Sequence, residues 1–277
     1  MDINGSEMTA FPAGPGGYPF LISIPHGGTK IPGELSGRIA LSSGEVAYYS
    51  DPHTRRLFDF GNRVAACVTA DVSRTAIDVN RSPLHLPPAY PDGVLKTVTV
   101  GGTPVYRPGS FPDEPLIHLL LLRYYFPFHI RIKNALEEGT IRIGFDCHSM
   151  LPENPPGKKN PGTARPLICL SNGGDRDGMP RPGKMPVTCP PEWMAALAAR
   201  FSAEFGEGSV RLNDPFTGGF ISRFHYRRHR IPWVQCEVNR CLYEAEDGSA
   251  DSERIEAVRE AVFWALAGFW GDMAGGE

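Results

Sequence analysis

The 277-residue sequence has no long hydrophobic run and no marked excess of either charge. Its most apolar window, Leu116–Leu122, contains His118 and is far shorter than the roughly 20 residues that cross a bilayer. We therefore expect no membrane association. The formal net charge is −3, which argues against a polybasic nucleic-acid-binding protein. One basic patch with interleaved aromatics, residues 223–230, is more typical of a pocket lining or a solvated turn.

The cysteine pattern excludes further classes of protein. Six cysteines are scattered along the chain without a CxxC pair, and two of them lie in apolar runs typical of buried strands. Reduced core thiols are therefore expected rather than a disulfide framework or a zinc knuckle. Residues 1–20 lack the basic start and the apolar stretch of a signal peptide, so we expect a cytoplasmic protein. The absence of a GxSxG motif disfavours a serine hydrolase.

Glycine and proline are abundant, with 31 and 27 residues, so many loops are expected. Short apolar runs alternate with helical patterns, which predicts one α/β domain over 1–277 whose mixed, largely parallel sheet is covered by helices on both faces. Two long loops, near 82–112 and 151–191, are expected to cover a functional site. The predicted strands are Phe20–Pro25, Ala66–Asp71, Ile141–Cys147, Pro166–Leu170 and Pro232–Val238, and the predicted helices are Pro52–Ala66, Glu114–Glu138, Pro191–Phe205 and Ser252–Trp270.

Histidines follow two of the predicted strands. His26 comes directly after the first strand, and His148 lies at the end of the third, two residues after Asp146. On an extended strand Asp146 and His148 share a face, so the carboxylate can orient an imidazole nearby. Each histidine alone is compatible with a loop residue whose ring nitrogens are hydrogen-bonded within the protein. Two imidazoles that converge at the carboxyl ends of strands, where α/β sheets bind ligands, are typical of a zinc site.

A catalytic zinc site needs a third protein ligand. Asp51 is the candidate, although an Asp followed by Pro52 is also typical of a helix N-cap with proline at the first helical position. His53 is the competing candidate ligand.

The apolar segment 234–240 contains a carboxylate, Glu237. A buried charge requires a partner or a metal, and a glutamate beside a metal-bound water can accept its proton and later deliver it to a leaving amine. The alternative is a structural salt bridge from Glu237 to Arg240 or Arg223.

Two arginines and an asparagine surround a short apolar stretch at residues 74–83. The planar fork of Arg74 or Arg81 matches a carboxylate, and Asn80 beside it can support the same anion, which indicates an acidic substrate. Surface arginines in a proline-rich loop are the alternative. Arg223 lies in a second polar cluster, residues 217–226, after a Gly-Gly turn.

Six motifs in this order resemble the N-formylglutamate amidohydrolase family: IPHGG (24–28), SDPHTRRL (50–57), IDVNRSP (77–83), FDCHSM (145–150), TGGFISRFHY (217–226) and QCEVNR (235–240). Parts of the set are also similar to aspartoacylases and zinc carboxypeptidases. The resemblance implies a phosphorylase/hydrolase-like three-layer α/β/α fold. It implies zinc or another divalent metal on His26 and His148, with Glu237 as general base and Asn80 with Arg81 as the carboxylate clamp.

One position departs from those relatives, because Thr29 stands where they place a ligand glutamate. The third ligand is therefore expected to be Asp51, with His53 as the alternative. Arg74 or Arg223 is expected to stabilise the oxyanion, and Arg223 is also a candidate for binding the substrate.

The function that the resemblance implies is hydrolysis of a small molecule, N-formyl-L-glutamate, to formate and L-glutamate, as in histidine degradation. A carboxypeptidase-like or broader N-acyl-amino-acid hydrolase is the nearest alternative. A binding module with structural histidines is the alternative from a different class.

Overall fold

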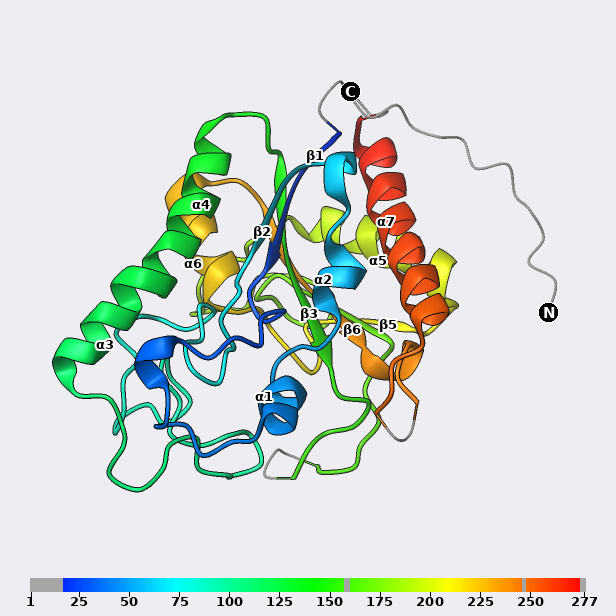
Figure 1. Ribbon diagram of the computed structural model, residues 1–277. Helices are drawn as coiled ribbons and strands as arrows, with labels where there is room; N and C mark the ends of the chain where they lie inside the picture. The colour runs from blue at the N-terminus through cyan, green and yellow to red at the C-terminus, as the bar shows by residue number, and fades with distance from the viewer. Residues whose placement is uncertain (1–16, 157–159, 246–247, 275–277) are drawn as a thin grey trace.

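A six-stranded β-sheet forms the centre of the molecule in the computed structural model, which describes residues 17–156, 160–245 and 248–274 (Figure 1). The strand order is β2-β1-β3-β6-β4-β5, and only the β6–β4 pair is antiparallel. The sheet is therefore mixed and largely parallel, as predicted. The strands are β1 (Tyr18–Ile24), β2 (Val64–Thr69), β3 (Ile143–Met150), β4 (Ile168–Ser171), β5 (Val210–Leu212) and β6 (Trp233–Asn239).

Helices cover both faces of this sheet (Figure 1), which confirms the predicted α/β fold. One layer contains α2 (Thr54–Phe58), α5 (Pro191–Phe205) and α7 (Ser252–Ala274), and the opposite layer contains α4 (Phe126–Glu137) and α6 (Phe220–His229). The central strand β3 is buried along its whole length, as expected for a parallel strand that is covered on both sides. Alternate strand residues therefore enter two separate apolar cores.

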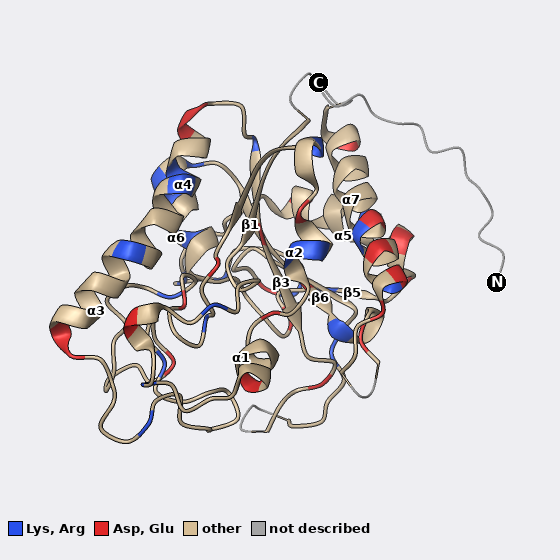
Figure 2. Ribbon diagram, in the orientation of Figure 1, with Lys and Arg blue, Asp and Glu red and all other residues tan. Residues whose placement is uncertain are grey.

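The predicted helix over 114–138 is one rod of three parts. It consists of α3 (Glu114–Leu120), a π-helical turn over Leu121–Tyr125, and α4. The 3-10 helices are Gly33–Leu35, Gly61–Arg63 and Arg240–Leu242. Figure 2 shows acidic and basic segments on both the α4 and the α7 sides of the sheet, in agreement with the small net charge. None of the helices in the described ranges is both long and apolar enough to span a membrane.

The predicted helix over Pro52–Ala66 is wrong. His53 has a left-handed backbone with φ 65°, so α2 begins at Thr54, and the last residues of the predicted helix belong to β2. Two α-helices and one strand were not predicted: α1 (Ser43–Tyr49), α6 and β5. In α6 the run RFHYRRH has too little apolar character to show helical periodicity, although its few buried residues pack onto β3 and β6.

A buried histidine pair joins α4 to α6. His129 Nδ1 lies 3.1 Å from His225 Nε2, and His129 Nε2 donates to the carbonyl of Val79 at 3.0 Å. Burial lowers the pKa of His129 to about 4 and depresses the pKa of His225 as well, and the nearby Arg228 and His229 act in the same direction on His225. Both imidazoles are therefore neutral in the folded protein at neutral pH.

This pair predicts a loss of stability in acid. In the unfolded chain both histidines titrate near 6.5, so below that pH the unfolded state takes up protons that the folded state does not. Each histidine is expected to lower the free energy of unfolding by about 2 kcal/mol between pH 7.5 and 5. Denaturant titrations of the wild type and His225→Leu at both pH values test this. The fall should be about 2 kcal/mol smaller in the variant, and an equal fall in both proteins would contradict the prediction.

Candidate active site

A cavity of about 400 Å³ lies at the carboxyl ends of the parallel strands. His26 follows β1, His148 lies near the end of β3, and Glu237 pairs in register with His148 on the neighbouring strand β6. All three side chains line the cavity. The strand ends therefore bring together the candidate residues that the sequence placed there.

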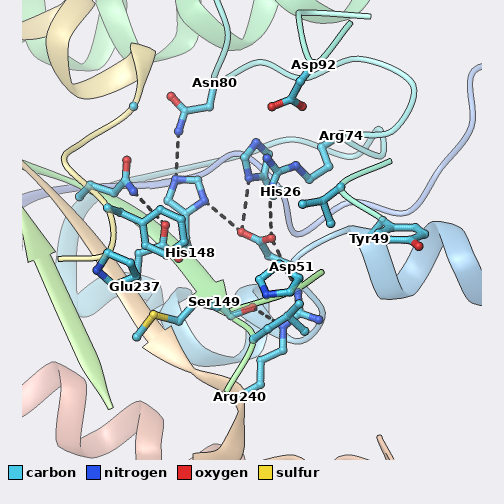
Figure 3. A pocket seen from close by; sticks show the side chains of 18 of the residues that line it. His26, Tyr49, Asp51, Arg74, Asn80, Asp92, His148, Ser149, Glu237 and Arg240 are labelled. Atoms are coloured by element: carbon cyan, nitrogen blue, oxygen red, sulfur yellow. Dashed lines mark hydrogen bonds and ion pairs between the residues drawn. The ribbon is translucent and has the colours of Figure 1, made fainter. Parts of the chain in front are cut away.

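Asp51 joins the two histidines (Figure 3). Its Oδ2 lies 3.3 Å from His26 Nδ1 and 3.0 Å from His148 Nδ1. One potential ligand atom from each of the three residues lies within 4.8 Å of the others, and all three residues are buried. The interpretation of Asp51 as a helix N-cap is wrong, because His53 precedes the first residue of α2 and the Asp51 carboxylate turns into the cavity.

The backbone around Asp51 explains this orientation. The Asp51 N–H donates to the carbonyl of His26 at 3.0 Å, and the Thr54 hydroxyl donates to the Asp51 carbonyl at 2.7 Å. The loop before α2 is thus tied to the loop after β1. The ring of His53, the competing candidate, instead contacts the ring of Tyr243, with 6.1 Å between ring centroids, and lies outside the His/Asp/His group.

Two further carboxylates contact the other ring nitrogen, Nε2, of the two imidazoles. His26 Nε2 lies 2.8 Å from Asp78 Oδ1, and His148 Nε2 lies 3.1 Å from Asp146 Oδ2. Such carboxylate–histidine pairs orient metal-binding imidazoles and leave the other nitrogen for the ion. Two imidazole nitrogens and one carboxylate oxygen form a donor set that suits zinc and leaves room for a fourth ligand. The residues present therefore fit a divalent metal.

The electrostatic setting also favours a cation. Burial raises the pKa of Asp51, but the charge of His26 and hydrogen bonds from His148 and His26 outweigh this effect and hold the pKa well below its usual range. Burial lowers the pKa of His148, but Asp146 and Asp51 together raise it well above its usual value. A metal on these atoms would take the place of a proton.

Glu237 is only 5% exposed and accepts a hydrogen bond from Gln235 Nε2 at 2.8 Å. Burial raises its pKa to about 7, with His148 acting in the opposite direction. A carboxyl group with a pKa near neutrality can both accept and donate a proton. The alternative salt bridge is wrong: in the described ranges Glu237 forms no ion pair with Arg240, which binds backbone carbonyls, or with Arg223.

The predicted arginines differ in where they lie. Arg74 lines the cavity and lies 3.3 Å from both Asp51 Oδ1 and Asp78 Oδ2. Arg81 also lines it, and its Nη2 lies 3.0 Å from Asp92 Oδ2. Arg223 does not line this cavity. It projects from α6 into a neighbouring cavity of about 720 Å³, where it donates to the Thr217 carbonyl at 3.3 Å, so the structure does not bring it to the histidines.

Asn80 lies between His148 and the start of α6. Figure 3 shows its side chain pointing toward the His148 ring. Its Nδ2 donates to Asp146 Oδ2 at 2.9 Å, and its Oδ1 accepts from the Ile221 N–H at 2.8 Å. The amide nitrogen therefore supports the His148–Asp146 pair, and the amide oxygen ties Asn80 to the start of α6. This contact was not foreseen for a residue expected to clamp a substrate carboxylate.

Gly219 is the residue that lets Asn80 take this place. A Cβ at Gly219 would lie 2.5 Å from the Asn80 amide, so Gly219→Ala must displace that side chain. We expect kcat/KM to fall on the order of 10-fold or more, since small misplacements of a site residue are costly. The matched control is Gly33→Ala, where an added methyl group meets no atom within 4 Å. Steady-state rates equal to wild type in Gly219→Ala would contradict the prediction.

Several site residues were missed in the sequence. Asp78 lies within the IDVNRSP motif, two residues before Asn80, and that spacing was the available signal. Lys96 and Arg165 line the cavity from the two long loops, which have no periodicity to mark them. Arg240 donates to the Ser50 carbonyl at 2.7 Å and fixes the segment before Asp51.

The buried histidines, the carboxylates and the cavity at the strand ends define a hydrolase-type active site on an α/β sheet. The model of the N-formylglutamate amidohydrolase family matches residues 18–244, and the chain belongs to this family. The resemblance noted in the sequence is thereby confirmed.

Individual relatives agree with this assignment. The chain is 28% identical over 259 residues to an N-formylglutamate deformylase of Pseudomonas aeruginosa, covering 89% of this chain and 91% of that protein. It is 26% identical over 245 residues to a Pseudomonas putida protein of the same name, covering 83% and 84%. The crystal structure of an N-formylglutamate amidohydrolase from Ralstonia eutropha JMP134 has the same fold, with a TM-score of 0.74 at 22% identity and coverage of 96% and 97%.

Proposed function

We propose that this protein hydrolyses N-formyl-L-glutamate to formate and L-glutamate, with a divalent metal, zinc by its donor set, on His26, Asp51 and His148. The observation that carries the proposal is the meeting of this group and Glu237 in one cavity. Membership of the family supports the choice of substrate. A place in cytoplasmic histidine degradation goes with the same assignment, and the free state of all six cysteines is compatible with it.

The metal, when bound, supplies Lewis-acid activation of the attacking water and of the amide carbonyl. Glu237 accepts the proton of that water and then delivers it to the nitrogen of the leaving glutamate. Arg74 lies in the same cavity and stabilises negative charge on the carbonyl oxygen. Arg81 receives the α-carboxylate, and Asn80 keeps His148 and its partner Asp146 in place.

The test combines elemental analysis with a product assay on one preparation. Purified protein is expected to hold about one divalent metal per chain and to release equal amounts of formate and glutamate from N-formyl-L-glutamate. N-acetyl-L-glutamate and N-formyl-L-methionine in parallel separate this activity from that of a broader N-acyl-amino-acid hydrolase. Metal-loaded, folded protein that releases no formate would refute the proposal.

A further inference from the structure

Cationic side chains are unusually dense in the catalytic cavity. The residues are Arg74, Arg81, Lys96, Arg165 and Arg240. Four of them are paired with carboxylates of the protein: Arg74 with Asp51 and Asp78, Lys96 with Asp78 and Asp92, Arg81 with Asp92, and Arg240 with Asp51. Arg240 also donates hydrogen bonds to Ser149 Oγ and to two backbone carbonyls. Arg165 is the exception, since it forms no ion pair with any carboxylate in the part of the chain that the structure describes.

Arg165 is nevertheless held firmly. Its Nε donates to Asn154 Oδ1 at 3.0 Å, and its guanidinium carbon lies 5.1 Å from the centroid of the Phe216 ring. Its backbone N–H donates to the Pro152 carbonyl at 2.8 Å, as part of antiparallel pairing between residues 152–154 and 163–165. The two terminal nitrogens form no hydrogen bond with the described residues. Burial lowers the pKa of Arg165, although the negative charge of Glu237 acts in the opposite direction.

A half-buried, fixed guanidinium without a counter-ion is suited to an anionic ligand. A guanidinium presents a planar pair of donors that matches a carboxylate. The cost of removing it from water is offset only when such an anion arrives. Because Arg165 lines the same cavity as the histidines, the anion belongs to the molecule that is hydrolysed there.

An N-acylated acidic amino acid brings two carboxylates into the cavity. The α-carboxylate is close to the amide nitrogen, so its receptor must lie near the reacting groups. Arg81 fits this position because the neighbouring Asn80 lies 3.1 Å from His148. The side-chain carboxylate lies farther along the substrate, and Arg165 has no contact with the His/Asp/His group among the described residues.

We infer that Arg165 binds the side-chain carboxylate of the substrate and thereby restricts the enzyme to N-acylated dicarboxylic amino acids. This inference rests on the proposed function and names its specificity-determining residue.

The test compares N-formyl-L-glutamate with N-formyl-L-glutamine, which differ only in the side-chain carboxylate. In Arg165→Gln the KM for N-formyl-L-glutamate should rise about 10- to 100-fold with little change in kcat, the effect of losing a charge-assisted pair of hydrogen bonds. The KM for N-formyl-L-glutamine should stay unchanged. Arg165→Lys should recover part of the loss, and Arg181→Gln, an exposed arginine outside both cavities, should match the wild type.

Two results would overturn the inference. One is an unchanged KM for N-formyl-L-glutamate in Arg165→Gln, and the other is an equal rise for both substrates. Calorimetric binding of N-formyl-L-glutamate to wild type and Arg165→Gln separates this inference from the proposed function. If the wild type binds without turnover, the proposed function fails, and the ratio of the two dissociation constants still decides the role of Arg165.

Discussion

Glu237→Gln is expected to lower kcat for N-formyl-L-glutamate by about 10²- to 10⁴-fold, the usual contribution of a general acid–base group. The amide keeps the size of the carboxyl group and its place on β6, but it cannot accept a proton from water. The side chain touches Gln235 and is not a member of the His/Asp/His group, so bound metal should remain. Stopped or continuous formate assays and elemental analysis on the same sample measure both quantities.

The control for this variant is Glu204→Gln, an exposed glutamate on α5 away from the cavity. It should match the wild type in rate, metal content and melting temperature. Glu237→Gln should also bind N-formyl-L-glutamate with near-normal affinity, because the loss concerns proton transfer. Turnover within a few-fold of wild type would remove Glu237 from the proposed mechanism.

Strand ends explain why much of this site could be predicted from sequence. His26, His148 and Glu237 each belong to or directly follow an apolar run, and parallel strands bring their carboxyl ends to one edge. Asp146 could be related to His148 by the two-residue repeat of a strand. The order of strands in the sheet was therefore not needed to predict that these residues lie at the same edge.

Residues in irregular segments could not be placed in the same way. Asp51 was ambiguous because an Asp-Pro pair is typical of a helix start. The left-handed conformation of His53, which delays α2 and frees the Asp51 carboxylate, has no signature in the sequence.

Two arginines show the same difficulty. Arg223 was predicted at the site but lies elsewhere, and Arg165 was not predicted but lines the cavity. Arg223 is in a family-like motif, but the turn of α6 directs it into the neighbouring cavity. Arg165 has no motif, yet pairing within the loop brings it to the catalytic cavity. Loop geometry and the direction of one helix thus decided which arginine reaches the site.

Removal of a metal ligand is the second change with a large expected effect. His148→Ala should abolish stoichiometric metal binding and lower kcat/KM by about 10³-fold or more, because metal activation of water and carbonyl is worth several kcal/mol. Chelation of the wild type should have the same effect, and added zinc should restore the chelated wild type but not the variant.

A graded series distinguishes a metal site from a purely structural histidine cluster. Asp146→Asn leaves the donor set intact but weakens the hold on His148 Nε2, so metal affinity should fall about 10- to 100-fold and excess metal should restore activity. His53→Asn, which tolerates the left-handed backbone, should keep full metal content because His53 lies outside the group. Metal content that falls in His53→Asn but not in His148→Ala would show that the ion is bound elsewhere. Full activity after complete removal of metal would show that the His/Asp/His group works without one.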